Sequence, residues 1–150
     1  MAQKKSSNWY IAATHYLTAG FAIPFVIGLI ASFLIRAGAP AFLSAPLLLM
    51  VFLLVIRVLS IWLGIKYSAN YLKKAYIIED KDKIVNLATT YFVVLNFGYF
   101  LVQIFSSNKF IGRGLAGADT AYSLVEIIIA VVLFYIFSKK YIRNTEVATM

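Results

Sequence analysis

The sequence has no cysteine and a single histidine, His15, among its 150 residues. Without cysteine the chain can form neither a disulfide, nor a thiolate metal site, nor a cysteine nucleophile. One histidine is too few for a bis-histidine haem or for a cluster of imidazoles on a metal within one chain. No nucleophile–base pair or metal-ligand set is recognisable, so we expect no enzymatic activity and no cofactor.

Charged residues are also scarce, at 13% of the chain, whereas hydrophobic residues make up 62% and the mean hydropathy is +0.84. Soluble domains are far less apolar. Crossing a hydrocarbon core of ~30 Å takes about 20 helical residues, and four runs are that long. They cover residues 9–35, 43–65, 85–105 and 118–137. The sequence therefore predicts an all-α, polytopic membrane protein, a single domain over residues 1–150 that folds as a four-transmembrane-helix bundle.

The basic residues are unevenly distributed between the ends of these spans. Ten of the fourteen Lys and Arg residues lie in the N-terminal segment, in the connection at residues 66–84 or in the C-terminal segment. Because Lys and Arg near span ends favour the cytoplasmic side, we expect both termini and this connection to be cytoplasmic, with the protein integral to the plasma (cytoplasmic) membrane. The net charge of +8 then indicates attraction to anionic headgroups on that side and not nucleic-acid binding.

A helical pattern continues past the second span, in "IKYSANYLKKAYII". Its apolar positions recur at helical spacing opposite a basic face. They are Tyr67, Tyr71, Ala75 and Ile78. We therefore expect a cytoplasmic helical extension that breaks at the mixed-charge run of residues 79–83. This extension either packs on the bundle or on headgroups, or docks a cytosolic partner.

One arginine, Arg57, interrupts the apolar stretch "FLLVIRVLSIWLG" in the second span. The helix rise places Arg57 about 12 Å from the cytoplasmic end of its span and Glu126 about 12 Å from the outer end of the fourth. Both are then within ~3 Å of the bilayer midplane, and Asn96 lies near the middle of the third span. A charge at this depth costs about 2.5–3.5 kcal/mol on insertion scales, so we expect Arg57 and Glu126 to face inward and pair, with Asn96 as a further partner.

Other polar side chains are predicted to line the interior near this cluster. Gln103 follows Asn96 at seven-residue spacing, and a polar stripe descends the fourth span to Glu126. The predicted secondary lining consists of Thr18, Gln103, Asp119 and Ser123. Two interpretations of the cluster stay open: a static pair that fixes helix register, or a binding site or passage for an ion, a proton or a small solute. His15 is expected to be a hydrogen-bonded packing residue, with a proton relay as the alternative.

The first span contains small residues at four-residue steps, which favours close helix packing. The predicted packing residues are Gly20, Pro24 and Gly28. Pro24 should also kink the helix or free a carbonyl near its centre. A broken helix that lines a binding site is the alternative reading of the same residues.

The segment "HYLTAGFAIPFVIGLIASFLIR" is similar to the first helix of Tic20-like small membrane proteins. This resemblance covers that one segment and implies no function. Two functions remain: a small transporter or channel component with a midplane polar site, or a non-catalytic accessory or scaffold subunit of a membrane complex. Because four short spans bury little surface, we expect a homo-oligomer or a place in a larger membrane complex.

Overall fold

The computed structural model describes residues 4–37, 46–106 and 116–145. Its regular structure there is helical, with no strand among the described residues. The elements are α1 (Asn8–His15), the π-helical segment η1 (Tyr16–Ala22), α2 (Ile23–Ala37), α4 (Pro46–Ala75), α5 (Lys81–Ser106) and α6 (Ala116–Tyr141). α1, η1 and α2 follow one another without a break and form the first long helix. The structure thus has four helices that are long and apolar enough to cross a membrane, as predicted.

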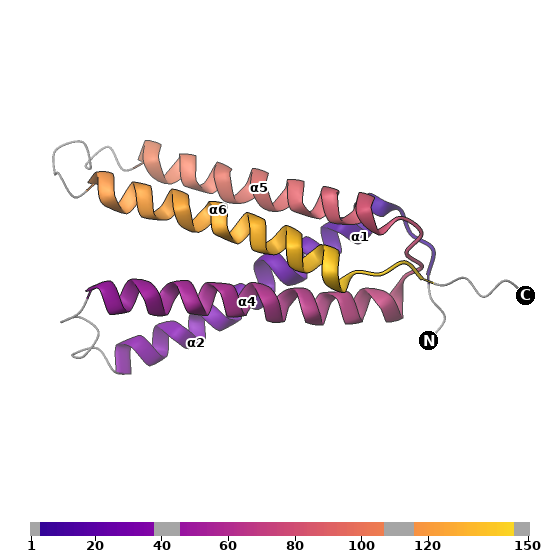
Figure 1. The fold of residues 1–150 in the computed structure, drawn as a ribbon, viewed down its shortest axis with the longest axis horizontal. Coiled ribbons are helices and arrows are strands. Elements are labelled where there is room, and N and C mark those ends of the chain that lie inside the picture. Colours follow the sequence, from indigo (N-terminus) through magenta and orange to yellow (C-terminus); the bar gives the residue numbers. More distant parts are fainter. Residues whose placement is uncertain (1–3, 38–45, 107–115, 146–150) are drawn as a thin grey trace, which may run out of the picture.

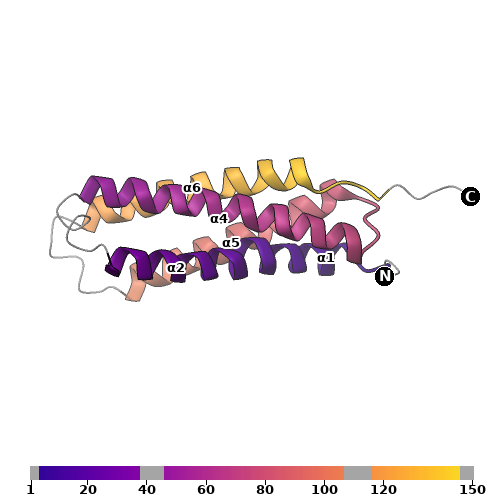
Figure 2. The ribbon, with the colours of Figure 1, turned by 90° about the horizontal axis from the view of Figure 1, so that it is seen from below.

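The four long helices pack side by side (Figures 1 and 2). α6 lies between α4 and α5, while the first long helix crosses the bundle diagonally, with α1 beside α5 and α2 beside α4. Both ends of the chain lie at the same end of the molecule. We call this the terminal end, and the end where α2 and α5 finish the distal end.

The predicted helical extension is confirmed, because α4 continues without interruption to Ala75. The break itself occurs earlier than predicted and overlaps the predicted run only at Glu79 and Asp80: α4 ends at Ala75, and α5 already begins at Lys81. The N-terminal segment causes the earlier stop. The backbone N–H of Lys4 donates to the carbonyl of Ala75 at 2.9 Å, and Ile77 N–H donates to the carbonyl of Lys4 at 3.2 Å. Asp80 then starts the next helix, because its carboxylate accepts from Lys83 N–H at 3.0 Å.

Three short segments close the terminal end, and we call them together the terminal cap: residues 4–7, 76–80 and 142–145. The C-terminal segment joins through Thr145, whose N–H donates to Ile78 O at 2.8 Å and whose hydroxyl accepts from Ile78 N–H at 2.9 Å. On the surface of the cap Lys5 pairs with Glu79 at 2.8 Å, and this carboxylate raises the pKa of the Lys5 ammonium. Both side chains are mostly exposed, so the ion pair contributes little to stability.

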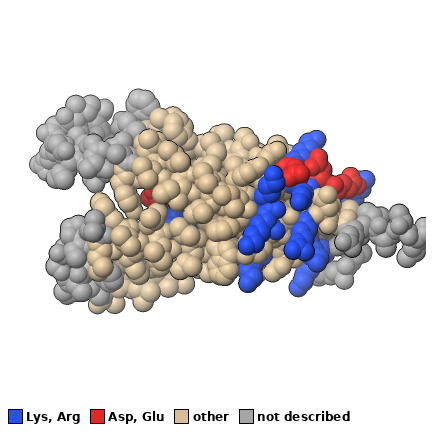
Figure 3. All heavy atoms as spheres, in the orientation of Figure 1, with Lys and Arg blue, Asp and Glu red and all other residues tan. Residues whose placement is uncertain are grey.

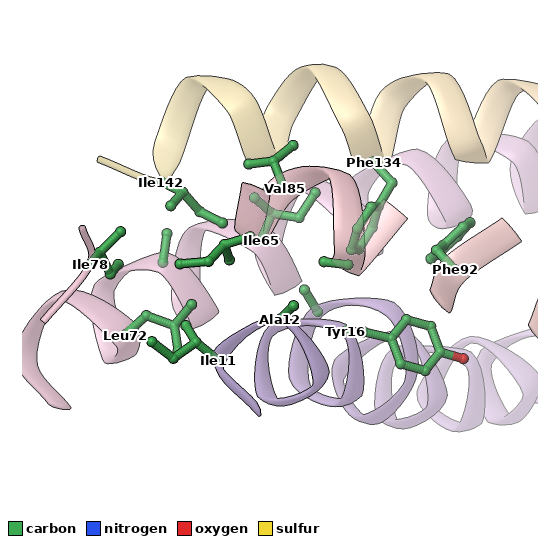
Figure 4. Packing of buried hydrophobic residues seen from close by; sticks show 14 of the residues in the cluster. Ile11, Ala12, Tyr16, Ile65, Leu72, Ile78, Val85, Phe92, Phe134 and Ile142 are labelled. Carbon is green, nitrogen blue, oxygen red and sulfur yellow. The ribbon is translucent and has the colours of Figure 1, made fainter. Parts of the chain in front are cut away.

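The hydrophobic core fills the half of the bundle next to the terminal cap (Figure 4). There α1 and η1 pack against α4 and α5, and side chains from all four long helices interdigitate. The largest fully buried apolar side chains are Phe92, Phe134, Ile11, Ile61, Ile65, Leu72, Ile78, Ile84, Ile142 and Val85. Beyond this half the described core thins to Ala31 and Phe100. The described buried side chains are therefore concentrated in the terminal half.

Candidate functional site

Arg57, Asn96 and Glu126 come together from α4, α5 and α6. The guanidinium of Arg57 donates from Nη2 to Asn96 Oδ1 at 3.2 Å. Asn96 is held in this orientation because its Nδ2 donates to the carbonyl of Phe92 at 2.8 Å, one turn back in α5. The structure thus places the three residues of the predicted midplane cluster side by side, and we call them the polar cluster.

The ion pair within the polar cluster is not closed. Arg57 Nε and Glu126 Oε1 are 3.8 Å apart, beyond the usual 2.7–3.2 Å of an N–H···O hydrogen bond. Arg57 Nε is itself buried and has no hydrogen-bond partner. The two side chains nevertheless keep 30% and 33% of their surface exposed. Arg57 Nε therefore retains hydrogen-bonding capacity that the described part of the protein does not use.

The polar cluster forms a layer directly on top of the packed core. Each of its members lies four residues, about one helical turn, from a buried core residue on its own helix. These neighbours are Ile61 for Arg57, Phe92 for Asn96 and Ala130 for Glu126. Figure 3 shows an acidic and a basic patch in a hollow on one face of the distal half. The core thus closes the cluster from the terminal side.

The predicted secondary lining is only partly placed at this site. Ser123 is half-buried on α6, one turn distal to Glu126. Thr18 lies in η1 next to Ala19, which contacts Gly64 of α4, and Gly64 is about 10 Å from Arg57 along the helix axis. The structure therefore does not bring Thr18 beside Arg57. Gln103 and Asp119 belong to α5 and α6, but their side chains lie outside the described part of the chain.

The predicted packing residues of the first span behave differently from one another. A Cβ added at Gly20 would lie 2.9 Å from the Phe92 ring, so this glycine allows a close approach to α5. Pro24 is buried. A Cβ at Gly28 would meet nothing within 4 Å, so Gly28 makes no close helix contact within the described chain. The closest backbone approach is at Gly64, which the sequence did not single out: a Cβ there would lie 2.7 Å from the carbonyl oxygen of Ala19.

A second polar site lies deep in the core, around His15. Its Nδ1 is 2.9 Å from Ser68 Oγ on α4, and its Nε2 is 2.9 Å from Ser138 Oγ on α6. All three residues are fully buried, and the imidazole packs on the ring of Phe134 with ring centres 5.5 Å apart. We call His15, Ser68 and Ser138 the histidine network. It joins three helices without any buried charge, since a neutral imidazole has one donor and one acceptor and each hydroxyl can take either role.

Sequence reasoning missed the two serines because both lie beyond the predicted ends of their spans. A signal was present in the periodicity. Ser68 is spaced helically between Ile65 and Leu72, and Ser138 stands four residues after Phe134 and four before Ile142. Helical residues at these spacings share a face, so both serines belong to the buried faces of their helices.

The chain offers no metal centre within its described residues, where no three His, Cys, Asp or Glu side chains gather. No protein-family model matches the chain, and comparisons with curated proteins and with solved structures also find no match. A functional assignment therefore depends on the chemistry of the polar cluster and of its surroundings.

Proposed function

We propose that this protein is an integral membrane transporter or channel component in which Arg57, Asn96 and Glu126 bind an ion, a proton or a small solute near the bilayer midplane. The open state of the ion pair carries this proposal. At 3.8 Å, with a third of each side chain exposed, the two charges can exchange partners with an entering ligand. Ionisable groups at such depth in membrane proteins commonly mark substrate or ion pathways.

The alternative, a scaffold in which the pair only fixes helix register, fits these observations less well. A buried ion pair offsets its desolvation cost only when its geometry is good and its remaining donors and acceptors are satisfied. Arg57 Nε has no hydrogen-bond partner, so this condition is not met. The histidine network already ties α1, α4 and α6 together with short hydrogen bonds. Register therefore does not require a charged pair one layer above the core.

The proposed membrane setting is supported by the surface of the helices. Large apolar side chains are exposed along all four of them, and a soluble monomer seldom exposes so large a continuous apolar surface. Basic side chains gather at the terminal end (Figure 3). The proposal places this end in the cytoplasm against anionic headgroups, and it includes assembly with further copies or a larger membrane complex.

Water access to the polar cluster can be tested by thiol labelling, because the chain has no cysteine of its own. Ser123 is half-buried near Glu126, whereas Val125, two residues on, is 52% exposed. In liposomes, a membrane-impermeant methanethiosulfonate should modify Ser123→Cys roughly tenfold faster or more than Val125→Cys, because the reactive thiolate forms in water and not in lipid. Equal rates, or faster labelling of Val125→Cys, would contradict a hydrated site.

Transport itself is tested by flux into proteoliposomes, with protons, potassium and chloride as the probes. Glu126→Gln keeps the shape of the side chain but removes its charge, so it should reduce the flux of the transported probe by about tenfold or more, or about 1.4 kcal/mol in the barrier. Glu79→Gln is the matched control, since Glu79 is an exposed carboxylate of the terminal cap. Wild-type flux in Glu126→Gln, or no flux in the wild type, would favour the scaffold.

A further inference from the structure

The two halves of the first long helix are anchored very differently. α1 is fixed by the core, where Ile11 and Ala12 are fully buried, and by the hydrogen bonds of His15 to α4 and α6. α2 packs against α4, with neither α5 nor α6 as a substantial neighbour in the described structure. Only Pro24 and Ala31 of α2 are buried. The first half is thus part of the core, and the second half is held along one narrow stripe.

A weak joint separates these halves. η1 is a π-helical segment of seven residues, whose wider turns are rare and occur often at functional sites. Pro24, the second residue of α2, lies two residues after the end of η1 and has no N–H to donate to the carbonyl of Gly20. Its ring would also clash with that carbonyl in a regular α-helix. The backbone ladder of α-helical hydrogen bonds is therefore interrupted between α1 and α2, where bending costs least.

The joint also has a fixed point to turn on. At Ala19 the backbone of η1 touches α4 so closely that any Cβ at Gly64 would lie 2.7 Å from the Ala19 carbonyl oxygen and 3.0 Å from its Cα. Gly20 also lies close to the ring of Phe92 on α5, because a Cβ there would be 2.9 Å from that ring. Movement on the terminal side of this contact is blocked by the core. Movement on the distal side meets only the contact of α2 with α4.

We propose that α2 is a hinged gate that turns at η1 and opens or closes the side of the bundle between α2 and α5, next to the polar cluster. Beyond the joint α2 diverges from α5 (Figure 1), and the two helices make no substantial contact in the described structure. When α2 moves towards α5, Arg57, Asn96 and Glu126 lie between four helices instead of three. That α2 controls access for a ligand rests on the proposed function, whereas the motion itself does not.

The motion can be measured with pairs of nitroxide labels, because introduced cysteines are the only thiols in the protein. The distal pair is Phe33→Cys on α2 with Tyr99→Cys on α5, and both positions are exposed, at 72% and 65%. The control pair is Trp9→Cys on α1 with Asn86→Cys on α5, also at exposed positions. Pulsed electron resonance in nanodiscs should give a distance distribution at least about twice as wide for the distal pair as for the control pair.

The variant Pro24→Ala tests whether η1 is the hinge of this motion. It restores an N–H that Gly20 O can accept, so a regular α-helix becomes possible and the distal distribution should narrow towards the width of the control pair. A distal distribution no wider than the control in the wild type would overturn the gate. A wide distribution that Pro24→Ala leaves unchanged would overturn η1 as its hinge. These distances are measured without solute, so a rigid α2 leaves the flux result standing, and absent flux leaves the hinge standing.

Discussion

At the scale of single residues, the histidine network shows how this chain places polar groups in a dry core. His15 is fully buried, yet both of its ring nitrogens have a serine partner at 2.9 Å. Each bond crosses between helices, from α1 to α4 and from α1 to α6. Fully satisfied buried networks of this kind make one packing arrangement more favourable than its neighbours. The network therefore fixes the positions of three helices where the core is densest.

Substituting His15 tests this role. His15→Ala removes both hydrogen bonds, leaves the two buried serine hydroxyls without this partner and creates a cavity beside Phe134. We therefore expect the free energy of unfolding to fall by about 2–5 kcal/mol. Ser68→Ala should cost roughly 1–3 kcal/mol, because it strands one nitrogen of the imidazole. The control is Ser32→Ala, whose exposed hydroxyl donates to Gly28 O within its own helix. Chemical unfolding in detergent provides the values, and equal losses for His15→Ala and Ser32→Ala would refute the assignment.

Depth along a helix could be predicted from the sequence, but partners across helices could be predicted only for charged groups. Arg57 and Glu126 must avoid lipid, so their similar depth was enough to expect that they meet. Hydroxyls carry no such requirement, since a serine in a helix can donate to its own backbone, as Ser60 does to Arg57 O at 2.8 Å. For this reason, and because both lie beyond the predicted ends of their spans, Ser68 and Ser138 were not predicted as partners of His15.

At the scale of elements, the crossing of the first long helix over α4 sets the shape of the bundle. The two backbones touch at Ala19 and Gly64, and from there α2 leaves the core at an angle. The sequence predicted a disturbance at Pro24 but not its form, because proline removes one donor without dictating how the chain rearranges. The end of α4 was likewise predicted too late in the sequence. Hydrogen bonds from residues distant in the sequence decide where α4 stops.

Two glycine substitutions distinguish the effect of this helix crossing on stability from the effect of helix propensity alone. Gly64→Ala places a methyl group 2.7 Å from backbone that cannot move aside easily, so it should destabilise the protein by about 1–3 kcal/mol. Gly98→Ala lies on α5 with nothing within 4 Å of the new methyl group. It should be neutral, or stabilising by up to about 1 kcal/mol, because alanine is the better helix former. Thermal unfolding in detergent measures both; a stabilising Gly64→Ala would mean that the helices are not in contact there.

At the scale of the whole molecule, the described buried side chains are concentrated at one end of the bundle. The terminal cap, the histidine network and the core occupy the half that contains both chain ends, while the distal half has few buried side chains in the described structure. Hydropathy alone could not predict this asymmetry, because all four spans read as similarly apolar. It arises from the angle at which α2 diverges, which is a property of packing between helices.

Orientation then decides which compartment the polar cluster faces. The Lys and Arg residues of the terminal end favour the cytoplasm, so the distal end should face outward. In a bacterial host, alkaline phosphatase, which is active only outside the cytoplasm, should be inactive when fused after residue 150 and active when fused after residue 110. A fluorescent protein, which folds in the cytoplasm, should show the reverse pattern. Phosphatase activity at residue 150 would show that the topology is inverted, and the distal end would then face the cytoplasm instead of the exterior.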